Sequence, residues 1–255
     1  MISATLVIYN EEERIRTCLE SIKHVVDEII IVHDGPCTDK TLDICKTYGA
    51  RIFIRPYIGE AEPHRLFSFE QAQGEWILQI DADEALSKEL QYKLHTLTQD
   101  PTIDAYSFRW EDEENLRILG LFPLKKYKPC LFRKTKIKFE GLVHEPTGTV
   151  GKLVTSDLLL HHKPKTRISN PTVFTKKTQH WSNIAAQTLI KKKKTPHPAQ
   201  LYLIKALIWG AFYLFYYLFI KGYLLCGKSG LGMARYHATY NFLLNYNIYK
   251  LKKQQ

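Results

Sequence analysis

Residues 74–84 read Gly-Glu-Trp-Ile-Leu-Gln-Ile-Asp-Ala-Asp-Glu, a short apolar run that stops at two aspartates one residue apart. A run of this length between a glycine and acidic residues predicts a buried strand over residues 76–80. Ligands of open parallel sheets bind beyond the carboxyl ends of the strands, so Asp81 and Asp83 stand where a ligand would lie. Two carboxylates at such a place can meet one hard cation, although acidic pairs also occur as solvated turns or helix caps.

The rest of the first hundred residues repeats this alternation of apolar runs and helical periodicity. Further strands are predicted over residues 5–9, 28–32, 51–54 and 106–110, and helices over residues 12–23, 42–48 and 62–73 and after Ser87. The pattern predicts an α/β fold with a mostly parallel central sheet and helices on both faces. Short strand-like pieces follow, and helical periodicity returns over residues 173–190.

Polar side chains follow two more of these predicted strands. Tyr9, Asn10 and Glu11 come after the first strand, and Asp34 comes after the second. Neither a G-x-G-x-x-G after the first strand nor a G-x-x-x-x-G-K-[ST] motif occurs. The sequence therefore argues against dinucleotide oxidoreduction and phosphate-loop ATP hydrolysis.

Composition restricts the class of protein. With 255 residues, 45% hydrophobic and 24% charged, the chain can bury a large core, which excludes a disordered tail, a disulfide-stapled miniprotein and a fibrous repeat. The 5 cysteines are scattered and form no C-x-x-C pair, which argues against a disulfide framework and a structural zinc site. The start of the sequence lacks the features of a signal peptide. We therefore expect a reducing, cytosolic compartment.

Charge is divided between the two halves of the chain. Through Asn115 there are 11 Lys and Arg against 23 Asp and Glu, a net charge of −12, whereas from Leu116 onward 25 basic residues face 3 acidic ones, a net charge of +22. This asymmetry indicates that the second half meets a polyanion, meaning nucleic acid, an anionic membrane surface or a phosphorylated substrate. A basic face that only keeps the protein soluble would give the same count.

An apolar, aromatic stretch over residues 201–226 follows a lysine run at residues 191–194. Only the 15 residues from Ala206 to Ile220 lie uncharged between flanking lysines, whereas crossing the hydrocarbon takes about 20. We therefore expect a helix that lies in or re-enters the membrane interface, with a helix buried in the protein core as the alternative. We accordingly divide the chain into a domain over residues 1–195 and a C-terminal helical region over residues 196–255.

Four blocks in roughly the first ninety residues resemble, in order and spacing, those of family 2 glycosyltransferases. They are residues 3–11 (Ser-Ala-Thr-Leu-Val-Ile-Tyr-Asn-Glu), residues 32–41 (Val-His-Asp-Gly-Pro-Cys-Thr-Asp-Lys-Thr), Arg65 and residues 74–84. Later blocks at residues 131–133, 142–145 and 159–161 resemble the branch that glucosylates the lipopolysaccharide inner core. Two positions depart from the pattern: Leu66 stands where the family usually has Asn, and His33 where the residue is often acidic or small.

The resemblance implies a GT-A fold, a nucleotide-sugar donor and a divalent cation, Mg²⁺ or Mn²⁺. It implies that Asp34 contacts the base or ribose of the nucleotide and that Arg65 neutralises or orients it. It places Tyr9, Asn10 and Glu11 in the same pocket. The structural alternatives are that Asp34 only caps a turn and that Arg65 only pairs with a surface carboxylate.

The resemblance also implies a set of metal-binding residues. Asp83 would ligate the metal directly, while Asp81 would join the metal shell through a bound water or touch the ribose. His161 matches a histidine near the end of the family's domain and would complete the shell. The alternative for His161, given the apolar residues 158–160 before it, is a histidine satisfied within the core.

The family is inverting, which implies a single in-line displacement and one carboxylate base on the acceptor side. Among the three acidic residues of the basic half we assign this base to Glu145. The pair Glu111 and Asp112 resembles the Glu-Asp pair of other branches. It lies in an acidic run over residues 111–114, however, and we expect a solvated loop there.

These expectations describe an inverting, metal-dependent glycosyltransferase. It would move a hexose from a nucleotide sugar to a lipopolysaccharide or lipooligosaccharide core acceptor, and we expect the hexose to be glucose and the nucleotide to be UDP. A Q-x-x-R-W block is missing, so we expect a single transfer rather than processive synthesis. The basic half and the apolar stretch would hold the protein peripherally at the inner face of the cytoplasmic membrane. The alternatives are another lipid-linked or surface glycan as acceptor and, in a different class, a nucleic-acid-binding module. No known nucleic-acid-binding motif occurs, so we expect no nucleic-acid partner.

Overall fold

The structure is a computed structural model that describes residues 1–112, 117–118, 122–123, 125–141, 147–163 and 171–254. The chain divides into two compact units, which we call unit 1 and unit 2. Unit 1 comprises Met1–Asp112 with Lys125–Pro164, and unit 2 comprises Glu113–Leu124 with Lys165–Gln255. This division differs from the expected one at residue 195 because the helix over residues 171–191 packs against the last helix of the chain. The expected functional division at residue 195 stays a prediction.

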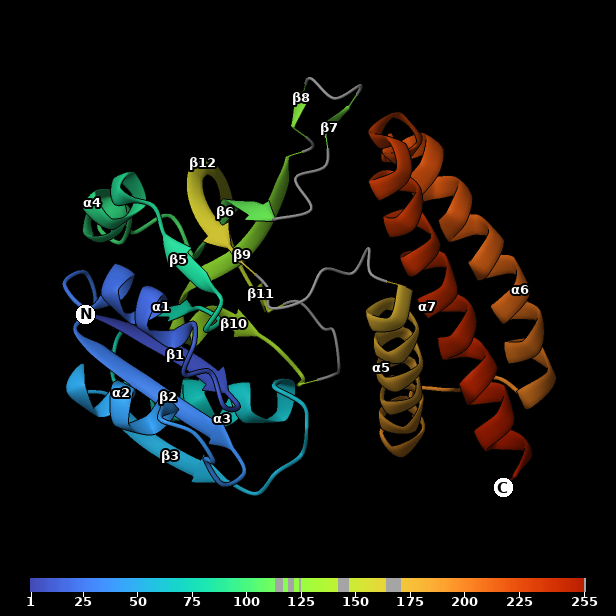
Figure 1. The fold of residues 1–255 in the computed structure, drawn as a ribbon, viewed down its shortest axis with the longest axis horizontal. Helices are drawn as coiled ribbons and strands as arrows, with labels where there is room; N and C mark the ends of the chain where they lie inside the picture. The colour runs from blue at the N-terminus through green and yellow to red at the C-terminus, as the bar shows by residue number, and fades with distance from the viewer. Residues whose placement is uncertain (113–116, 119–121, 124, 142–146, 164–170, 255) are drawn as a thin grey trace. The chain divides into compact units, whose positions relative to one another are not determined.

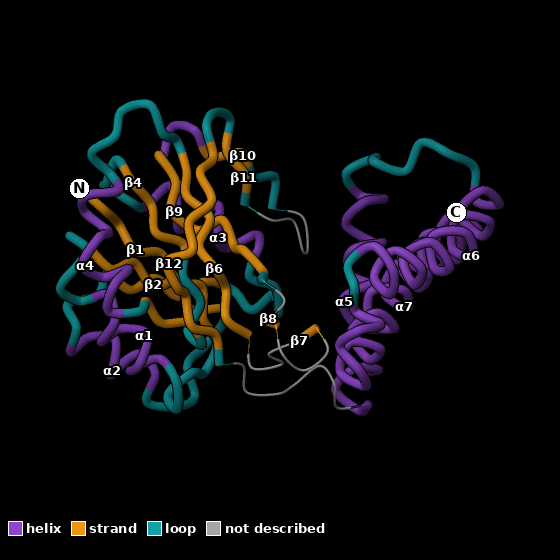
Figure 2. The backbone as a smooth tube through the Cα atoms, turned by 90° about the horizontal axis from the view of Figure 1, so that it is seen from above, coloured by secondary structure: helices purple, strands orange, loops and turns teal. Residues whose placement is uncertain are grey.

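Within the described residues, unit 1 is built on an 8-stranded sheet with the order β3-β2-β1-β4-β9-β6-β12-β5 (Figures 1 and 2). Its strands are β1 (Ile2–Ile8), β2 (Glu28–Asp34), β3 (Arg51–Arg55), β4 (Trp76–Gln79), β5 (Glu84–Leu86), β6 (Ala105–Asp112), β9 (Lys126–Arg133) and β12 (Leu153–His162). After β9 come the 3₁₀ turn η1 (Lys134–Lys136) and the short antiparallel pair β10 (Ile137–Lys138) and β11 (Gly148–Thr149).

The sheet has a parallel half and a mixed half. β1 pairs in parallel with β2 and with β4, and β2 pairs in parallel with β3. β9 then runs antiparallel to both β4 and β6, while β12 is parallel to β6 and antiparallel to β5. The predicted parallel arrangement therefore holds for the first four long strands, and the second half departs from it.

Helices cover both faces of the sheet, as predicted. They are α1 (Ile15–Ile22), α2 (Thr41–Thr47), α3 (Glu62–Gln71) and α4 (Lys88–Leu97). Successive side chains of a strand point to opposite faces. In β2, Ile29 and Ile31 belong to the core cluster that α1, α2 and α4 complete, whereas Ile30 and Val32 pack in a second cluster with Phe69 of α3. Because β2 is buried on both faces, its sequence is a continuous apolar run.

Local capping agrees with the sequence at one helix and not at another. Ser87 caps α4 as predicted, since its Oγ accepts a hydrogen bond from the Leu90 amide at 3.2 Å. Thr38, which the sequence suggested as the N-cap of α2, instead accepts a hydrogen bond from Asn10 Nδ2 at 2.8 Å. The helix begins at Thr41, whose amide donates to Asp39 Oδ1 at 2.9 Å.

Unit 2 is helical apart from one short strand pair. Its elements are β7 (Arg117–Ile118), β8 (Phe122–Pro123), α5 (Pro171–Lys191), α6 (Ala199–Phe215), the π-helical η2 (Tyr216–Ile220), the 3₁₀ η3 (Tyr223–Cys226) and α7 (Gly227–Lys253). α7 packs against both α5 and α6. A Cβ at Gly210 would lie 3.2 Å from the Phe242 Cβ, so the glycine permits a close approach of α6 and α7.

The apolar stretch forms one continuous helical segment, Ala199–Ile220, of 22 residues. Its mean hydropathy is 1.8 and 6% of it is buried, so in length and composition this segment could cross a membrane, the one such segment among the described residues. Its exposure argues against the alternative of a helix buried in the core. Whether it spans or lies in an interface stays a prediction.

Candidate active site

The carboxyl ends of β1, β2 and β4 bring most of the predicted site residues to one edge of the sheet. Asp34 is the last residue of β2, while residues 9–11 follow β1 and the D-x-D segment at residues 81–83 follows β4. The three strands are neighbours and parallel, so these segments emerge in the same direction. The structure therefore brings together the groups that sequence patterns singled out one by one.

Asp34 is 4% exposed, and both of its oxygens accept hydrogen bonds. Oδ1 accepts from the Ile58 amide at 2.7 Å and from His64 Nε2 at 2.9 Å, and Oδ2 accepts from the Gly59 amide at 2.8 Å. The carboxylate thus fastens the loop after β3 to the end of β2. Its expected contact with a nucleotide stays a prediction.

The residues after β1 make an exposed aromatic surface. The Tyr9 ring lies 5.1 Å from the Tyr57 ring and 5.8 Å from the His33 ring, and both tyrosines are exposed. Asn10 has a φ of 49°, in the left-handed region that asparagine tolerates better than most residues. The backbone N–H of Asn10 donates a hydrogen bond to His33 Nε2 at 3.3 Å, and this bond holds the neighbouring Tyr9 beside His33.

A charged cluster surrounds Asp81. Arg65 Nη2 donates to its Oδ1 at 2.9 Å, and Lys128 Nζ donates to its Oδ2 at 2.7 Å. The same Nζ lies 2.7 Å from each oxygen of Glu84, a side chain that is 1% exposed. Lys128 and Glu84 were not recognised as site residues in the sequence.

The cluster shifts the pKa of each of its members. Burial by itself would raise the pKa of Asp81, but Lys128 and Arg65 outweigh it and hold that pKa well below its usual range. Burial raises the pKa of Glu84 although Lys128 opposes this, and for Lys128 the two carboxylates outweigh burial and raise its pKa. Asp81 is therefore an ionised group that is fully engaged with cations.

Asp83 has different partners. Its Oδ2 lies 3.5 Å from Arg14 Nη1 and 3.5 Å from His162 Nε2. Its carbonyl oxygen accepts a hydrogen bond from the Lys163 amide at 2.8 Å, which ties the D-x-D segment to the end of β12. The Glu11 carboxylate accepts hydrogen bonds from Arg14.

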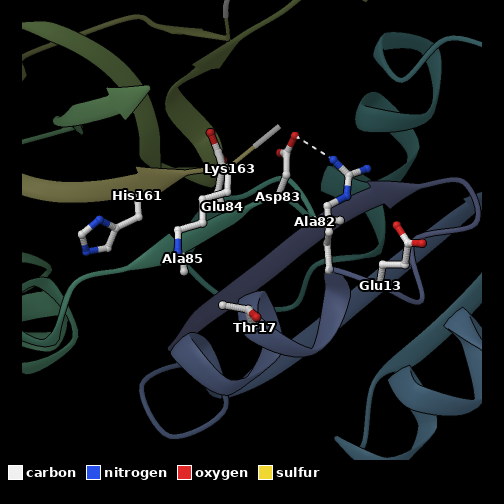
Figure 3. Close-up of a pocket in the computed structure, with 9 residues that line it drawn as sticks. Glu13, Thr17, Ala82, Asp83, Glu84, Ala85, His161 and Lys163 are labelled. Atoms are coloured by element: carbon white, nitrogen blue, oxygen red, sulfur yellow. Dashed lines mark hydrogen bonds and ion pairs between the residues drawn. The ribbon is translucent and has the colours of Figure 1, made fainter. Parts of the chain in front are cut away.

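A cavity of about 380 Å³ lies beside Asp83 (Figure 3). Its lining residues come from α1 and the turn before it, from the D-x-D segment and β5, and from the end of β12: Glu13, Arg14, Thr17, Ala82, Asp83, Glu84, Ala85, His161 and Lys163. None of residues 9–11, Asp34, Arg65 or Asp81 lines it. Of the predicted nucleotide-binding and metal-binding residues that follow β1, β2 and β4, Asp83 is therefore the one that lines this cavity.

The histidine whose ring meets Asp83 is His162, not the expected His161. His161 lines the cavity, but its Nδ1 is hydrogen-bonded to Glu111 Oε2 at 3.0 Å. The two histidines are successive residues of β12, so their side chains point to opposite faces. The proposed role of His161 in a metal shell accordingly passes to His162.

The first two residues of the acidic run at residues 111–114 lie in a strand and not in the expected loop; the other two lie outside the described residues. Glu111 and Asp112 are the last residues of β6 and pair with His161 and His162 of β12. The β-strand continues because β12 supplies a parallel partner over this stretch, which local sequence does not reveal. The other candidate base, Glu145, lies outside the described residues.

The donor set at Asp83 fits a divalent cation. Among the described residues no group of three or more His, Cys, Asp and Glu could hold a metal by itself. One carboxylate and one imidazole, with Oδ2 and Nε2 3.5 Å apart, are spaced close to the roughly 3 Å of two adjacent ligands on one octahedral cation. Substrate phosphates would have to complete the shell, as is usual for cations that bind phosphorylated substrates.

The sequence profile described as Glycosyl transferase family 2 matches residues 3–149. The chain belongs to this family. As a member of glycosyl transferase family 2 it is a transferase, which the strand-end blocks had predicted.

Two relatives refine the assignment. The chain is 29% identical to the lipopolysaccharide core biosynthesis glycosyltransferase LpsC of Rhizobium meliloti, over 98% of this chain and 92% of that protein. It is 28% identical to an uncharacterized glycosyltransferase of Rickettsia bellii, over 95% of this chain and 84% of that protein. The comparisons give no support to the nucleic-acid-binding alternative.

A solved structure confirms the fold. Glucosyl-3-phosphoglycerate synthase from Mycobacterium tuberculosis, in complex with Mn²⁺ and uridine-diphosphate-glucose, superposes with a TM-score of 0.50 at 16% identity. The match covers 74% of this chain and 78% of that one. The expected GT-A fold is therefore correct, and a divalent cation is present in a structure that shares it.

Lys128→Met should destabilise the protein, because the buried Glu84 carboxylate would lose its cation and would lie beside Asp81, which would keep only Arg65. We expect a loss of about 3 kcal/mol in the free energy of unfolding. Protonation of either carboxyl relieves the repulsion, so the deficit relative to the parent protein should be larger at about pH 8 than at about pH 5. Urea unfolding at the two pH values measures it.

Lys125→Met is the matched control, because Lys125 forms an exposed pair with Asp157 at 3.0 Å. It should leave the unfolding midpoint unchanged at both pH values. An unfolding midpoint of Lys128→Met equal to that of the parent would contradict the role given to this cluster.

Proposed function

We propose that this chain transfers glucose, with inversion, from UDP-glucose to a lipopolysaccharide core acceptor in a reaction that depends on a divalent cation. The main observation behind the proposal is that Asp83 Oδ2 lies 3.5 Å from His162 Nε2, beside a cavity at the end of the parallel strands. The similarity to LpsC over nearly the whole chain supports the choice of acceptor. Other lipid-linked or surface glycans are the second acceptor class.

The strand-end residues suit the nucleotide half of the donor. The exposed rings of Tyr9 and Tyr57 offer apolar faces on which a nucleobase can stack. Asn10, Glu11 and Asp34 lie at the ends of β1 and β2, the same edge of the sheet as Tyr9. Arg65, bound to Asp81, brings positive charge to the same edge.

The groups around Asp83 suit the diphosphate. Transfer breaks the bond between the anomeric carbon and the phosphate oxygen, so negative charge develops on the departing nucleoside diphosphate. A divalent cation held by Asp83 and His162 would supply charge stabilisation for it. Arg14, at 3.5 Å from Asp83, and Lys163, at the cavity wall, add fixed positive charge beside it. These side chains orient the leaving group for a single in-line displacement.

The acceptor hydroxyl must lose its proton as it attacks. We propose that the carboxylate of Glu145, in the Leu-Val-His-Glu block of the sequence, accepts this proton as the general base. The new bond joins the acceptor oxygen to the anomeric carbon on the face opposite the leaving phosphate, which accounts for inversion.

Unit 2 suits a membrane-bound acceptor. Large apolar side chains of α6 and η2 are exposed, including Leu207, Trp209, Phe215 and Phe219. The basic second half of the chain adds electrostatic attraction to anionic lipid, about 1 kcal/mol per lysine or arginine near the surface. We propose that this unit holds the enzyme at the inner face of the cytoplasmic membrane.

Release of UDP from UDP-glucose, in the presence of core oligosaccharide acceptor and Mn²⁺, tests donor, acceptor and metal together. Chelation with EDTA should abolish release, and Mn²⁺ should restore it more fully than Mg²⁺ because an imidazole ligand suits manganese better. Asp83→Asn and His162→Gln should each lower turnover by about 10²-fold or more. His161→Gln, the neighbouring histidine, is the control and should stay near the parent rate. Full activity in EDTA would sink the metal assignment.

Glu145→Gln should leave UDP binding within about twofold of the parent while lowering transfer by about 10²- to 10⁴-fold, the usual contribution of a general base. Isothermal titration with UDP and Mn²⁺ measures the binding, and single-turnover transfer measures the chemistry. Glu140→Gln provides the matched control on the same stretch of chain. Near-normal transfer by Glu145→Gln would move the base to another carboxylate.

Flotation with lipid vesicles tests the membrane proposal. The protein should float with vesicles that contain anionic lipid and bind them less at high salt, because salt screens the basic surface. Replacing Leu207 and Phe215 by serine should release it, since each side chain is more than half exposed and would lose its apolar contact with lipid. Quantitative recovery of the parent protein in the vesicle-free fraction at low salt would argue against membrane association.

A further inference from the structure

Trp110 of β6 lies between Glu84 and His162, two side chains near the D-x-D segment. Its ring stacks on the His162 ring with a centroid distance of 4.2 Å and an interplanar angle of 29°. Its indole Nε1 donates a hydrogen bond to Glu84 Oε1 at 2.8 Å. One side chain therefore contacts both the residue after the D-x-D segment and the histidine that meets Asp83.

Glu84 is a fixed anchor for the indole. Its carboxylate accepts from Lys128 at both oxygens, from the Asp81 amide at 3.0 Å and from Trp110. It is 1% exposed and belongs to β5, which pairs with the end of β12. A buried carboxylate with this many partners has no alternative position to adopt, so the indole bonded to it is held as well.

The His162 ring needs such support. The pairing of β12 with β5 and β6 sets the position of its backbone. Pairing does not set the rotation of the ring about its side-chain bonds. A stacked aromatic neighbour restricts that rotation, and such pairs contribute about 0.5–1.5 kcal/mol beyond their burial. The indole face is the contact that aims Nε2 at Asp83.

We propose that Trp110 is a positioning residue: anchored by Glu84, it orients His162 so that His162 and Asp83 form a pre-arranged pair for a divalent cation. The proposal rests on the proposed function, since it concerns the same cation. It adds a group that neither touches the cation nor belongs to any block of the sequence that resembles the family. Supporting side chains of this kind commonly contribute 10- to 100-fold to metal affinity.

Mn²⁺ affinity of the purified full-length protein in the presence of UDP, measured by the paramagnetic resonance signal of free Mn²⁺ and corrected for Mn²⁺ bound by UDP alone, tests the proposal without any assay of transfer. Trp110→Leu, which removes both ring face and N–H, should weaken Mn²⁺ binding about tenfold. Trp110→Phe, which keeps a ring face, should stay within about threefold of the parent. Trp181→Leu is the matched control: Trp181 also lies against a histidine, His180 at 5.0 Å, but belongs to unit 2. It should leave Mn²⁺ affinity unchanged.

A double-mutant cycle with His162→Gln separates positioning from a general structural effect. If Trp110 acts through His162, the double variant should bind Mn²⁺ no more weakly than His162→Gln alone. Additive losses, or parent-like affinity in Trp110→Leu, would overturn the proposal. Should Trp110→Leu fail to fold, Trp110→Met keeps apolar bulk without a ring and enters the same cycle. Absence of any Mn²⁺ binding by the parent protein beyond that of UDP alone would instead refute the proposed metal dependence, and the positioning role with it.

Discussion

One partly buried ammonium group, Nζ of Lys128, holds together the acidic residues at the end of β4. It contacts Asp81 and both oxygens of Glu84, and without it two carboxylates in a poorly solvated place would repel each other. With it, Asp81 is occupied by Lys128 and Arg65, and Asp83 is the aspartate that lines the cavity. The D-x-D motif is therefore asymmetric: its first carboxylate is held by Lys128 and Arg65, and its second lines the cavity.

The same ammonium group links the two halves of the sheet. Lys128 lies on β9, the strand that turns the sheet from parallel to mixed, and it is 47 residues from Asp81 in the chain. His162 comes from β12, which joins the sheet only through β6 and β5. The parallel half thus supplies Asp81 and Asp83, whereas the mixed half supplies Glu84, Lys128 and His162. Neither half forms the site alone.

This division explains what the sequence could predict. The parallel half follows local rules: apolar runs between helical periods give strands β1 to β4, and the carboxyl-end rule brings residues 9–11, Asp34 and the D-x-D segment together. Lys128 is one of 36 lysines and arginines, and no local feature distinguishes it from the others. The difference between His161 and His162 depends on which of the two side chains of β12 points toward Asp83, and a shift of one residue exchanges the two faces. Strand β5 has 3 residues, too few to give a periodic pattern.

The charges at the site give a physical reason for the proposed divalent cation. Four carboxylates contact three cationic side chains there: Glu11, Asp81, Asp83 and Glu84 with Arg14, Arg65 and Lys128. Glu13 and Lys163 at the cavity wall add one charge of each sign. The protein alone therefore presents a slight negative excess to a diphosphate, although the chain as a whole carries +10. A divalent cation held by Asp83 and His162 would reverse the sign of this excess, so donor and cation would each favour the binding of the other.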